Sequence, residues 1–399
     1  MAPKVPSPEF DAGLAALLAL ALCTTVAQGL ARFSFGPLLP LMRGDVVNSY
    51  AAGGMLATTH MIGYLAGAFL SLRVSKRIAA SRVVQWGLGS TTIGLGCLTV
   101  SSGPAVAGVG LFFTGVGGAL VWLPAPGLAA AVFRRDPGRG IGIVASSMGL
   151  GIALGSGIPV LSDVLGGWRG VWGVEAVIAI VVLVAAHRLL KTSEEPQRSS
   201  DKKDALWRPD ARWWCTTIAF SSFSFGTVTC LTFFVAALMD AGVSTRAANG
   251  VYGLIGIAMI CGGVVAERLS RLAGRVPTLI GQCVGAAGAV LFTTSGYLPF
   301  AVIMALILGM SMSGTAAVVS ADLNDRYPQA QMTAAFSLMF IPVGIGQILG
   351  PLTGGWAGDL TGDPFTALVV AGSVMAAGSV PLLIQVLWSA RRSKCGITP

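Results

Sequence analysis

The sequence predicts an all-α integral membrane protein with twelve transmembrane helices, built as two six-helix halves related by pseudo-symmetry. Three observations lead to this prediction: an apolar composition, a series of long apolar segments, and short motifs that recur at a near-constant offset. Hydrophobic residues make up 54% of the 399 residues and charged residues only 11%. A soluble domain typically carries about 25% charged residues, so the composition excludes an ordinary soluble protein.

The long apolar segments have the length that a membrane span requires. A helix needs about 20 apolar residues to cross a hydrocarbon core of about 30 Å, and backbone groups in that core must be satisfied within the helix. Pro37 and Pro40 predict a kink or an end in the first segment, which is too long for one straight crossing. The expected spans are 12–42, 50–72, 83–102, 104–133, 141–161, 169–187, 213–239, 249–266, 276–295, 298–320, 332–354 and 365–388.

The basic residues sort between alternate loops, and this sorting predicts an orientation. Of the 26 Lys and Arg residues, Arg43, Arg169 and Arg246 fall on one side, Arg32 falls inside a span, and the rest fall on the other side. Cytoplasmic loops carry the excess of basic residues. We therefore expect both termini and the central loop to be cytoplasmic, in a bacterial inner membrane, and the net charge of +9 does not indicate nucleic-acid binding.

The chain divides near its middle into two similar parts. A polar linker at 188–212 separates an N-terminal half, 1–187, from a C-terminal half, 213–399. Phe-Ser-Phe-Gly at 33–36 returns at 223–226, and Gly-x-x-x-Gly at 151–155 returns at 346–350. Ordered matches at such similar offsets favour an internal repeat, and parallel six-helix repeats are known in membrane transporters.

The sequence lacks the residues that several other classes of protein require. The seven cysteines form no Cys-x-x-Cys motif, so the sequence indicates neither a zinc site nor a disulfide framework. No Lys follows a Gly, so no phosphate-binding loop of a primary pump is present. Two isolated histidines do not form a catalytic cluster. We expect a protein that is not an enzyme and that has no cofactor and no metal.

A glycine- and proline-rich segment lies near the end of the chain: Gly346-Gln-Ile-Leu-Gly350-Pro351-Leu-Thr-Gly354-Gly355. This segment is similar to the GxxxGPxxGG signature of the major facilitator superfamily, so the sequence resembles that superfamily. Within it, the chain resembles the bacterial YbfB/YjiJ-type branch in three stretches, 29–42, 60–68 and 350–362. The resemblance implies a secondary transporter that moves a small solute by alternating access between its halves. Leu111 lies near the place of an Arg found in many proton-coupled members, so the energy source stays open.

Arg32 is the strongest single candidate for contact with a substrate. A charge inside a span is costly unless it is paired or hydrated, and a guanidinium binds anionic groups through its fork of donors. Arg32 could instead brace carbonyls freed around Pro37, or pair with an internal acid. We slightly favour an organic anion or metabolite as the solute. The alternatives are a multidrug or metabolite efflux pump of the same fold and a membrane sensor that has lost transport.

Several other residues are candidates for the site or for the conformational change. Glu175 and His60 are candidates for proton coupling, with structural roles as the alternatives, and the structural role is favoured for Glu175. The remaining candidates for substrate binding are Gln28, His60, Trp122, Ser222, Tyr252 and Gln347. The candidates for gating are Glu267, Arg268, Asp322, Gly346, Gly350 and Pro351. The expected partners are a small-molecule substrate and the lipid bilayer, with no nucleic acid, and we expect a monomer.

Overall fold

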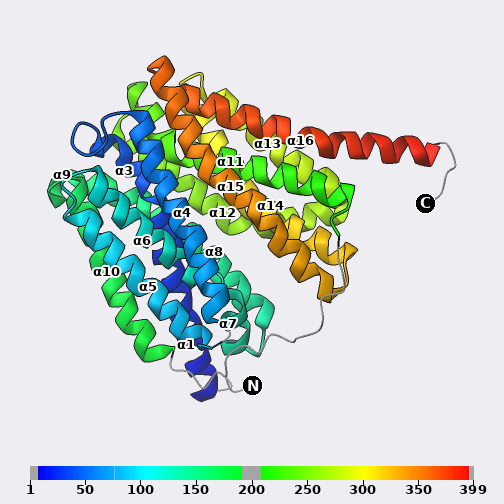
Figure 1. Ribbon diagram of the computed structural model, residues 1–399, viewed down its shortest axis with the longest axis horizontal. Coiled ribbons are helices and arrows are strands. Elements are labelled where there is room, and N and C mark those ends of the chain that lie inside the picture. Colours follow the sequence, from blue (N-terminus) through cyan, green and yellow to red (C-terminus); the bar gives the residue numbers. More distant parts are fainter. Residues whose placement is uncertain (1–7, 76, 191–207, 395–399) are drawn as a thin grey trace, which may run out of the picture. The chain divides into compact units, whose positions relative to one another are not determined.

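The computed structural model describes residues 8–75, 77–190 and 208–394, and nearly all of them are helical (Figure 1). No β-strand occurs in these ranges. The elements are α1 (Pro8–Thr24), η1 (Thr25–Leu30), α2 (Ala31–Phe33), α3 (Phe35–Met42), α4 (Tyr50–Val74), α5 (Ala80–Thr99), α6 (Pro104–Trp122), α7 (Ala125–Val132), α8 (Pro137–Gly157), η2 (Ile158–Leu161), α9 (Ser162–Leu165), α10 (Trp168–Leu189), α11 (Ala211–Asp240), α12 (Thr245–Ala273), α13 (Arg275–Thr293), α14 (Leu298–Arg326), α15 (Gln329–Thr361) and α16 (Phe365–Lys394).

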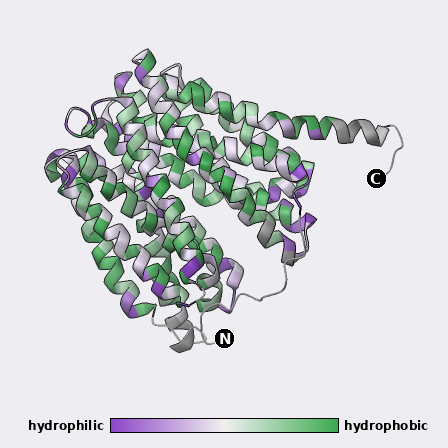
Figure 2. Ribbon diagram, in the orientation of Figure 1, coloured by the Kyte–Doolittle hydropathy of each residue, from purple (hydrophilic) through white to green (hydrophobic). Residues whose placement is uncertain are grey.

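The predicted all-α membrane architecture is confirmed. Eleven helical segments of the described chain are long and apolar enough to cross a membrane. The twelfth expected span corresponds to α5, a helix of 20 residues that carries hydroxyl and amide side chains such as Gln85 and Thr91. Figure 2 shows apolar residues along the helices and hydrophilic ones gathered mainly at helix ends and in loops. Most of the central linker predicted at 188–212 lies outside the described residues.

The chain forms two compact units. The first contains Met1–Val46 and Thr59–Ser199, and the second contains Val47–Thr58 and Ser200–Pro399. The first turns of α4 therefore belong to the second unit. There, the Asp359 carboxylate accepts hydrogen bonds from the backbone N–H groups of Tyr50, at 2.6 Å, and Ala51, at 3.0 Å. The N-terminus of a helix leaves such N–H groups without intrahelical partners, so Asp359 satisfies them and complements the helix dipole.

The first span is an interrupted helix. A π-helical turn, η1, follows α1, and Ser34 separates α2 from α3. Pro37 has no N–H group and cannot donate to the carbonyl of Phe33, which explains an interruption at this point. The sequence predicts a kink around Pro37 and Pro40; the structure has the interruption at Ser34 and continues helically through Pro40 to Met42.

Glycines allow close contact between the first and fifth spans of the first unit and between the first and fifth spans of the second. A Cβ atom on Gly29 of η1 would lie 2.3 Å from the Cα atom of Gly151 in α8. In the second unit, a Cβ atom on Gly346 of α15 would lie 2.7 Å from the carbonyl oxygen of Ser221 in α11. In lipid, the hydrophobic effect does not drive helices together. Their association depends on van der Waals contacts, which such close packing provides.

Candidate functional site

The guanidinium of Arg32 lies in a polar and aromatic cluster inside the first unit. The sequence puts it in α2, the short helical segment between η1 and the interruption at Ser34. Its Nη1 donates to Oε1 of Gln28 at 3.1 Å, and its Nη2 lies 3.9 Å from the sulfur of Met61. Arg32 is partly exposed in the unit, whereas Gln28 is buried. The charge therefore sits within the span, on a side chain that is partly exposed.

Aromatic rings and a backbone carbonyl fix this arrangement. The guanidinium carbon lies 4.9 Å from the ring centroid of Tyr64 and 5.1 Å from that of Phe33. Such contacts stabilise a cation by about 0.5–2 kcal/mol, more when water is excluded. The amide nitrogen of Gln28 donates to the carbonyl of Gly118 in α6 at 2.7 Å. That second bond orients the amide so that its oxygen faces Arg32.

His60 is buried on α4, and its hydrogen bond with Thr114 indicates which of its ring nitrogens carries a hydrogen. Nδ1 lies 3.0 Å from Oγ1 of Thr114, which itself donates to the carbonyl of Leu111 at 2.7 Å. Because the single hydroxyl hydrogen of Thr114 is used in this way, the hydrogen between the two residues belongs to Nδ1. Nε2 of His60 is buried and has no hydrogen-bond partner among the described residues.

Glu175 is fully buried on α10 and contacts the interruption in the first span. The hydroxyl of Ser34 donates to its Oε1 at 2.5 Å. Its other oxygen, Oε2, is buried without a hydrogen-bond partner in the described part of the chain. Burying a charged carboxylate with so few partners is costly, so this acid stands out among the polar groups of the unit.

The other substrate candidates do not all join this cluster. Trp122 ends α6 in the first unit and is partly exposed, whereas Ser222, Tyr252 and Gln347 belong to the second unit. Tyr252 is buried beside Phe234, with ring centroids 6.4 Å apart. Ser222 faces α16, because a Cβ atom on Gly378 would overlap its side chain. The structure thus brings together Arg32 and Gln28, with His60 on the neighbouring α4.

The gating candidates lie at helix ends or in close helix contacts of the second unit. Glu267 pairs with Arg271 and Arg275, at 3.1 and 2.7 Å, while Arg268 is exposed on the same helix. Asp322 is buried and pairs with Arg212 at 2.9 Å and also with Arg326.

The other gating candidates lie in close helix contacts. Gly350 contacts α11, where an added Cβ atom would lie 2.5 Å from the carbonyl of Phe225. The carbonyl of Pro351 faces Gly54 of α4 in the same way.

Four residues of these clusters were not among the predicted site residues: Ser34, Met61, Tyr64 and Thr114. Ser34 belongs to the repeated Phe-Ser-Phe-Gly motif, and Tyr64 follows His60 by one helical turn. Residues four apart lie on one face of a helix, so the spacing of Tyr64 was a usable signal. The contact of Ser34 with Glu175 joins residues 141 apart and had no local signal.

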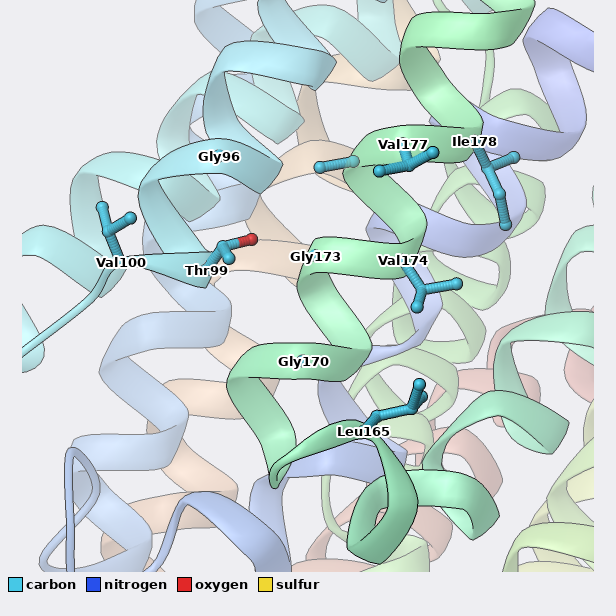
Figure 3. A pocket seen from close by; sticks show the side chains of 10 residues that line it. Gly96, Thr99, Val100, Leu165, Gly170, Gly173, Val174, Val177 and Ile178 are labelled. Carbon is cyan, nitrogen blue, oxygen red and sulfur yellow. The ribbon is translucent and has the colours of Figure 1, made fainter.

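Two further features limit what the described residues can bind. An apolar groove of about 680 Å³ lies between α5 and α10 (Figure 3), and it is lined by glycines and by side chains such as Thr99, Leu165 and Val174. None of the predicted site residues lines it, and it offers no charge to an anion. No group of three His, Cys, Asp or Glu side chains in the described ranges could hold a metal ion.

Comparison with known proteins agrees with the helical membrane architecture. The family model described as "Uncharacterised MFS-type transporter YbfB" matches residues 24–383. The uncharacterized transporter YycB of Bacillus subtilis (strain 168) is 26% identical over 367 residues, covering 86% of this chain and 87% of YycB. The putative uncharacterized transporter YgaY of Escherichia coli (strain K12) is 26% identical over 200 residues, 49% of this chain and 48% of its own.

Solved structures share the fold at low sequence identity. A bacterial homologue of the human lysosomal transporter Spinster has a TM-score of 0.70 and 16% identity, with 95% of this chain and 96% of that chain covered. The D-xylose-proton symporter has a TM-score of 0.72 and 15% identity, with 92% and 97% covered. From its helices, its repeat and the family match over most of its length, this chain belongs to the YbfB-type family of transporters in the major facilitator superfamily.

Proposed function

We propose that this transporter carries a small organic anion and that Arg32 is its anion-binding group. The observation that carries the proposal is the placement of Arg32: a guanidinium well inside the first span, oriented by Gln28 and flanked by Tyr64, yet partly exposed. A positive charge inside a membrane span is stabilised by an opposite charge. A carboxylate or phosphate would supply that charge and accept hydrogen bonds from the fork.

The transport step in this proposal is alternating access between the two halves of the protein, with both termini in the cytoplasm of a bacterial cell. His60 and Trp122 in the first unit, and Tyr252, Gln347 and Ser222 in the second, are proposed as further contacts with the solute. The ion pairs of Glu267 and Asp322 and the close contacts of Gly346, Gly350 and Pro351 are the proposed points of rearrangement. Arg268, on the exposed face of α12, is proposed to take part only in another state. We further propose that the transporter works as a monomer.

A ligand panel on the purified protein tests the proposal. Benzoate, succinate and inorganic phosphate serve as anionic probes, and tetraphenylphosphonium serves as a cationic probe. A ligand that binds only the folded state raises the melting temperature. We expect an anionic probe to stabilise the protein and to be taken up by proteoliposomes. Stabilisation by the cation alone would contradict the proposal and favour drug efflux.

Variants at matched positions assign the effect to Arg32. A hydrogen bond to a charged group contributes about 1.5–3 kcal/mol, so Arg32→Ala should weaken binding of the anionic probe on the order of 10- to 100-fold. Arg32→Lys keeps the charge and loses the fork, and we expect a smaller loss. Arg73→Ala, a matched Arg→Ala change at an exposed position on α4, is the control. Unchanged binding in Arg32→Ala would remove Arg32 from the site.

A further inference from the structure

The apolar groove between α5 and α10 starts where α5 ends and α10 begins, and it runs along α10 toward the middle of the span (Figure 3). On α10 its lining extends from Gly170 to Ile178, which is about 12 Å at a rise of 1.5 Å per residue. Half of a hydrocarbon core of about 30 Å is about 15 Å. The groove therefore matches the acyl-chain region of one leaflet in length.

The surface of the groove suits an acyl chain. Val100 and Val177 line it and are 74% and 60% exposed. The hydroxyl of Thr99 donates to the carbonyl of Leu95 in its own helix at 2.9 Å, so it needs no partner in the groove. A Cβ atom on Gly96 would meet no atom within 4 Å, so the glycine leaves open space. A hydrocarbon chain fills such a surface without leaving a polar group unsatisfied.

A pair of opposite charges lies at the end of the groove where α10 begins. Arg169 directly precedes Gly170, which lines the groove. Its Nε donates at 2.8 Å to the carbonyl of Ser101, the residue after Val100. Its Nη1 and Nη2 donate to the carboxylate of Asp45, at 2.5 and 3.2 Å. Both side chains stay accessible, with 37% of Arg169 and 43% of Asp45 exposed. The apolar groove thus ends at an exposed cation beside an exposed anion.

This pair keeps hydrogen-bonding capacity for a ligand. A guanidinium has five N–H groups, and the bonds of Arg169 within the described chain use three of them. A carboxylate accepts about four hydrogen bonds. Asp45 accepts two from Arg169 and one from Nε1 of Trp168, at 3.2 Å. The remaining N–H groups suit a phosphate and the remaining acceptor suits an ammonium group. Exposed Arg43, on the same loop, and Asp163, on α9, add one charge of each sign.

We propose that the groove and the Arg169–Asp45 pair together bind one phospholipid with a zwitterionic headgroup that carries a primary amine. Its phosphate accepts hydrogen bonds from Arg169, its ammonium group donates to Asp45, and one acyl chain fills the groove. In the orientation proposed above, this lipid belongs to the outer leaflet. Asp45 lies between the first span and α4, so the headgroup ties that loop to the start of α10. The site is independent of the solute that the protein carries.

Defined lipids test the headgroup assignment. The protein is purified in detergent and stripped of lipid, and phosphatidylethanolamine, phosphatidylcholine and phosphatidylglycerol with identical acyl chains are added separately. Native mass spectrometry measures the lipid retained, and thermal unfolding measures the rise in melting temperature that binding causes. We expect phosphatidylethanolamine to be retained best. Choline has no N–H group to donate to Asp45, and phosphatidylglycerol places a net negative charge beside it. Equal retention of the three lipids would overturn the proposal.

Filling the groove tests the acyl-chain site. Gly96→Leu places a side chain in the open space, and displacing two methylene groups of the lipid should lower retention about tenfold. Gly89→Leu is the matched control. It lies seven residues earlier on the same face of α5, also has no atom within 4 Å of the new Cβ, and does not line the groove. Retention in Gly96→Leu equal to that in Gly89→Leu would overturn the proposal, as would a dimer that only Gly96→Leu dissociates.

Two variants separate the roles of the charged residues. Arg169→Gln should lower retention of all three lipids, because each carries a phosphate. Asp45→Asn should abolish the preference for phosphatidylethanolamine over phosphatidylcholine and raise retention of phosphatidylglycerol, because the acceptor for the ammonium group and the repulsion are both lost. Neither variant changes the groove itself. An unchanged order of the three lipids in Asp45→Asn would show that this carboxylate does not read the headgroup.

Discussion

The tetrapeptide Phe-Ser-Phe-Gly occurs in two helices that differ in regularity. At 33–36 it falls on an interruption, preceded by the π-helical turn η1, whereas at 223–226 it lies inside α11, which is regular from Ala211 to Asp240. Pro37 follows the first copy, and Thr227 occupies the corresponding place after the second. The same four residues therefore adopt either form, and the residues around them decide which.

The two copies of Phe-Ser-Phe-Gly also differ in the chemistry of the residues that precede them. The first copy is preceded by Gln28 and Arg32, and the corresponding residues of the second copy are Ile218 and Ser222. Ile218 is exposed on its unit and Ser222 faces Gly378, so neither offers a charge or an amide for a solute. The comparison indicates that the first span combines packing with a charged group, Arg32, which α11 lacks at the matched position.

The largest expected effect comes from giving α11 the proline of the first span. Thr227→Pro removes the N–H group that bonds the carbonyl of Phe223 and adds a steric clash, which costs about 3 kcal/mol or more in a helix interior. Pro37→Ala in the first span should not lower stability, because it restores a donor. Thermal unfolding in detergent, followed by tryptophan fluorescence, measures both. Equal losses in the two variants would contradict the view that only α11 requires regularity.

Adding a side chain at the two contacts between first and fifth spans should lower stability by different amounts, and by less than Thr227→Pro does. On Gly151 an added Cβ atom would lie 2.3 Å from the carbonyl of Thr25, and on Gly346 it would lie 2.7 Å from that of Ser221. Overpacking of this kind costs about 1–3 kcal/mol, so Gly151→Ala should lower the melting temperature more than Gly346→Ala. Gly89→Ala, with no atom within 4 Å of the new Cβ, is the control for the glycine replacement itself. A larger loss in Gly346→Ala would reverse the ranking.

Replacing Gln28 should weaken anion binding without removing it. Gln28→Leu takes away the acceptor that orients Arg32 and the donor to Gly118. Loss of the two bonds, at a net contribution of about 1 kcal/mol each, predicts a rise in Kd for the anionic probe of up to about 30-fold. Ile218→Leu, at the matched position of α11, should leave Kd unchanged. An effect of the same size in both variants would indicate a general change of the fold, which circular dichroism checks.

The smallest effect is expected at the loop after the first span. Nη1 of Arg169 lies 2.5 Å from Oδ2 of Asp45, and this hydrogen bond lowers the pKa of the Asp45 carboxyl. A carboxyl whose pKa is lower in the folded state stabilises the protein above its unfolded pKa, near 3.9, and this stabilisation is lost as pH falls through the folded pKa. Exposed pairs contribute little, so Asp45→Asn should lower the melting temperature by less than about 2 °C at neutral pH. The difference from the wild type should vanish in acid, and a difference that grows there would contradict this assignment.

Helix positions could be predicted from the sequence because each depends on a local property. Apolar runs located the spans, and Pro37 indicated an irregularity close to the observed one at Ser34. The membrane-embedded charge of Arg32 was equally visible, since a charged residue in an apolar run needs no structure to be noticed. The partners of these residues could not be predicted from the sequence. The bonds from Gln28 to Gly118 and from Ser34 to Glu175 link residues 90 and 141 apart, and only the packing of helices brings them together.

The π-helical turn at Thr25–Leu30 has a consequence for the register of the first span. Such a turn is equivalent to one extra residue in an α-helix, and each residue of an α-helix rotates the chain by about 100°. Removing one residue from η1 would turn every later side chain of the span by that angle relative to α1. Arg32 would then present its guanidinium to a different neighbour. A single inserted residue thus selects the direction in which the charge of this transporter points.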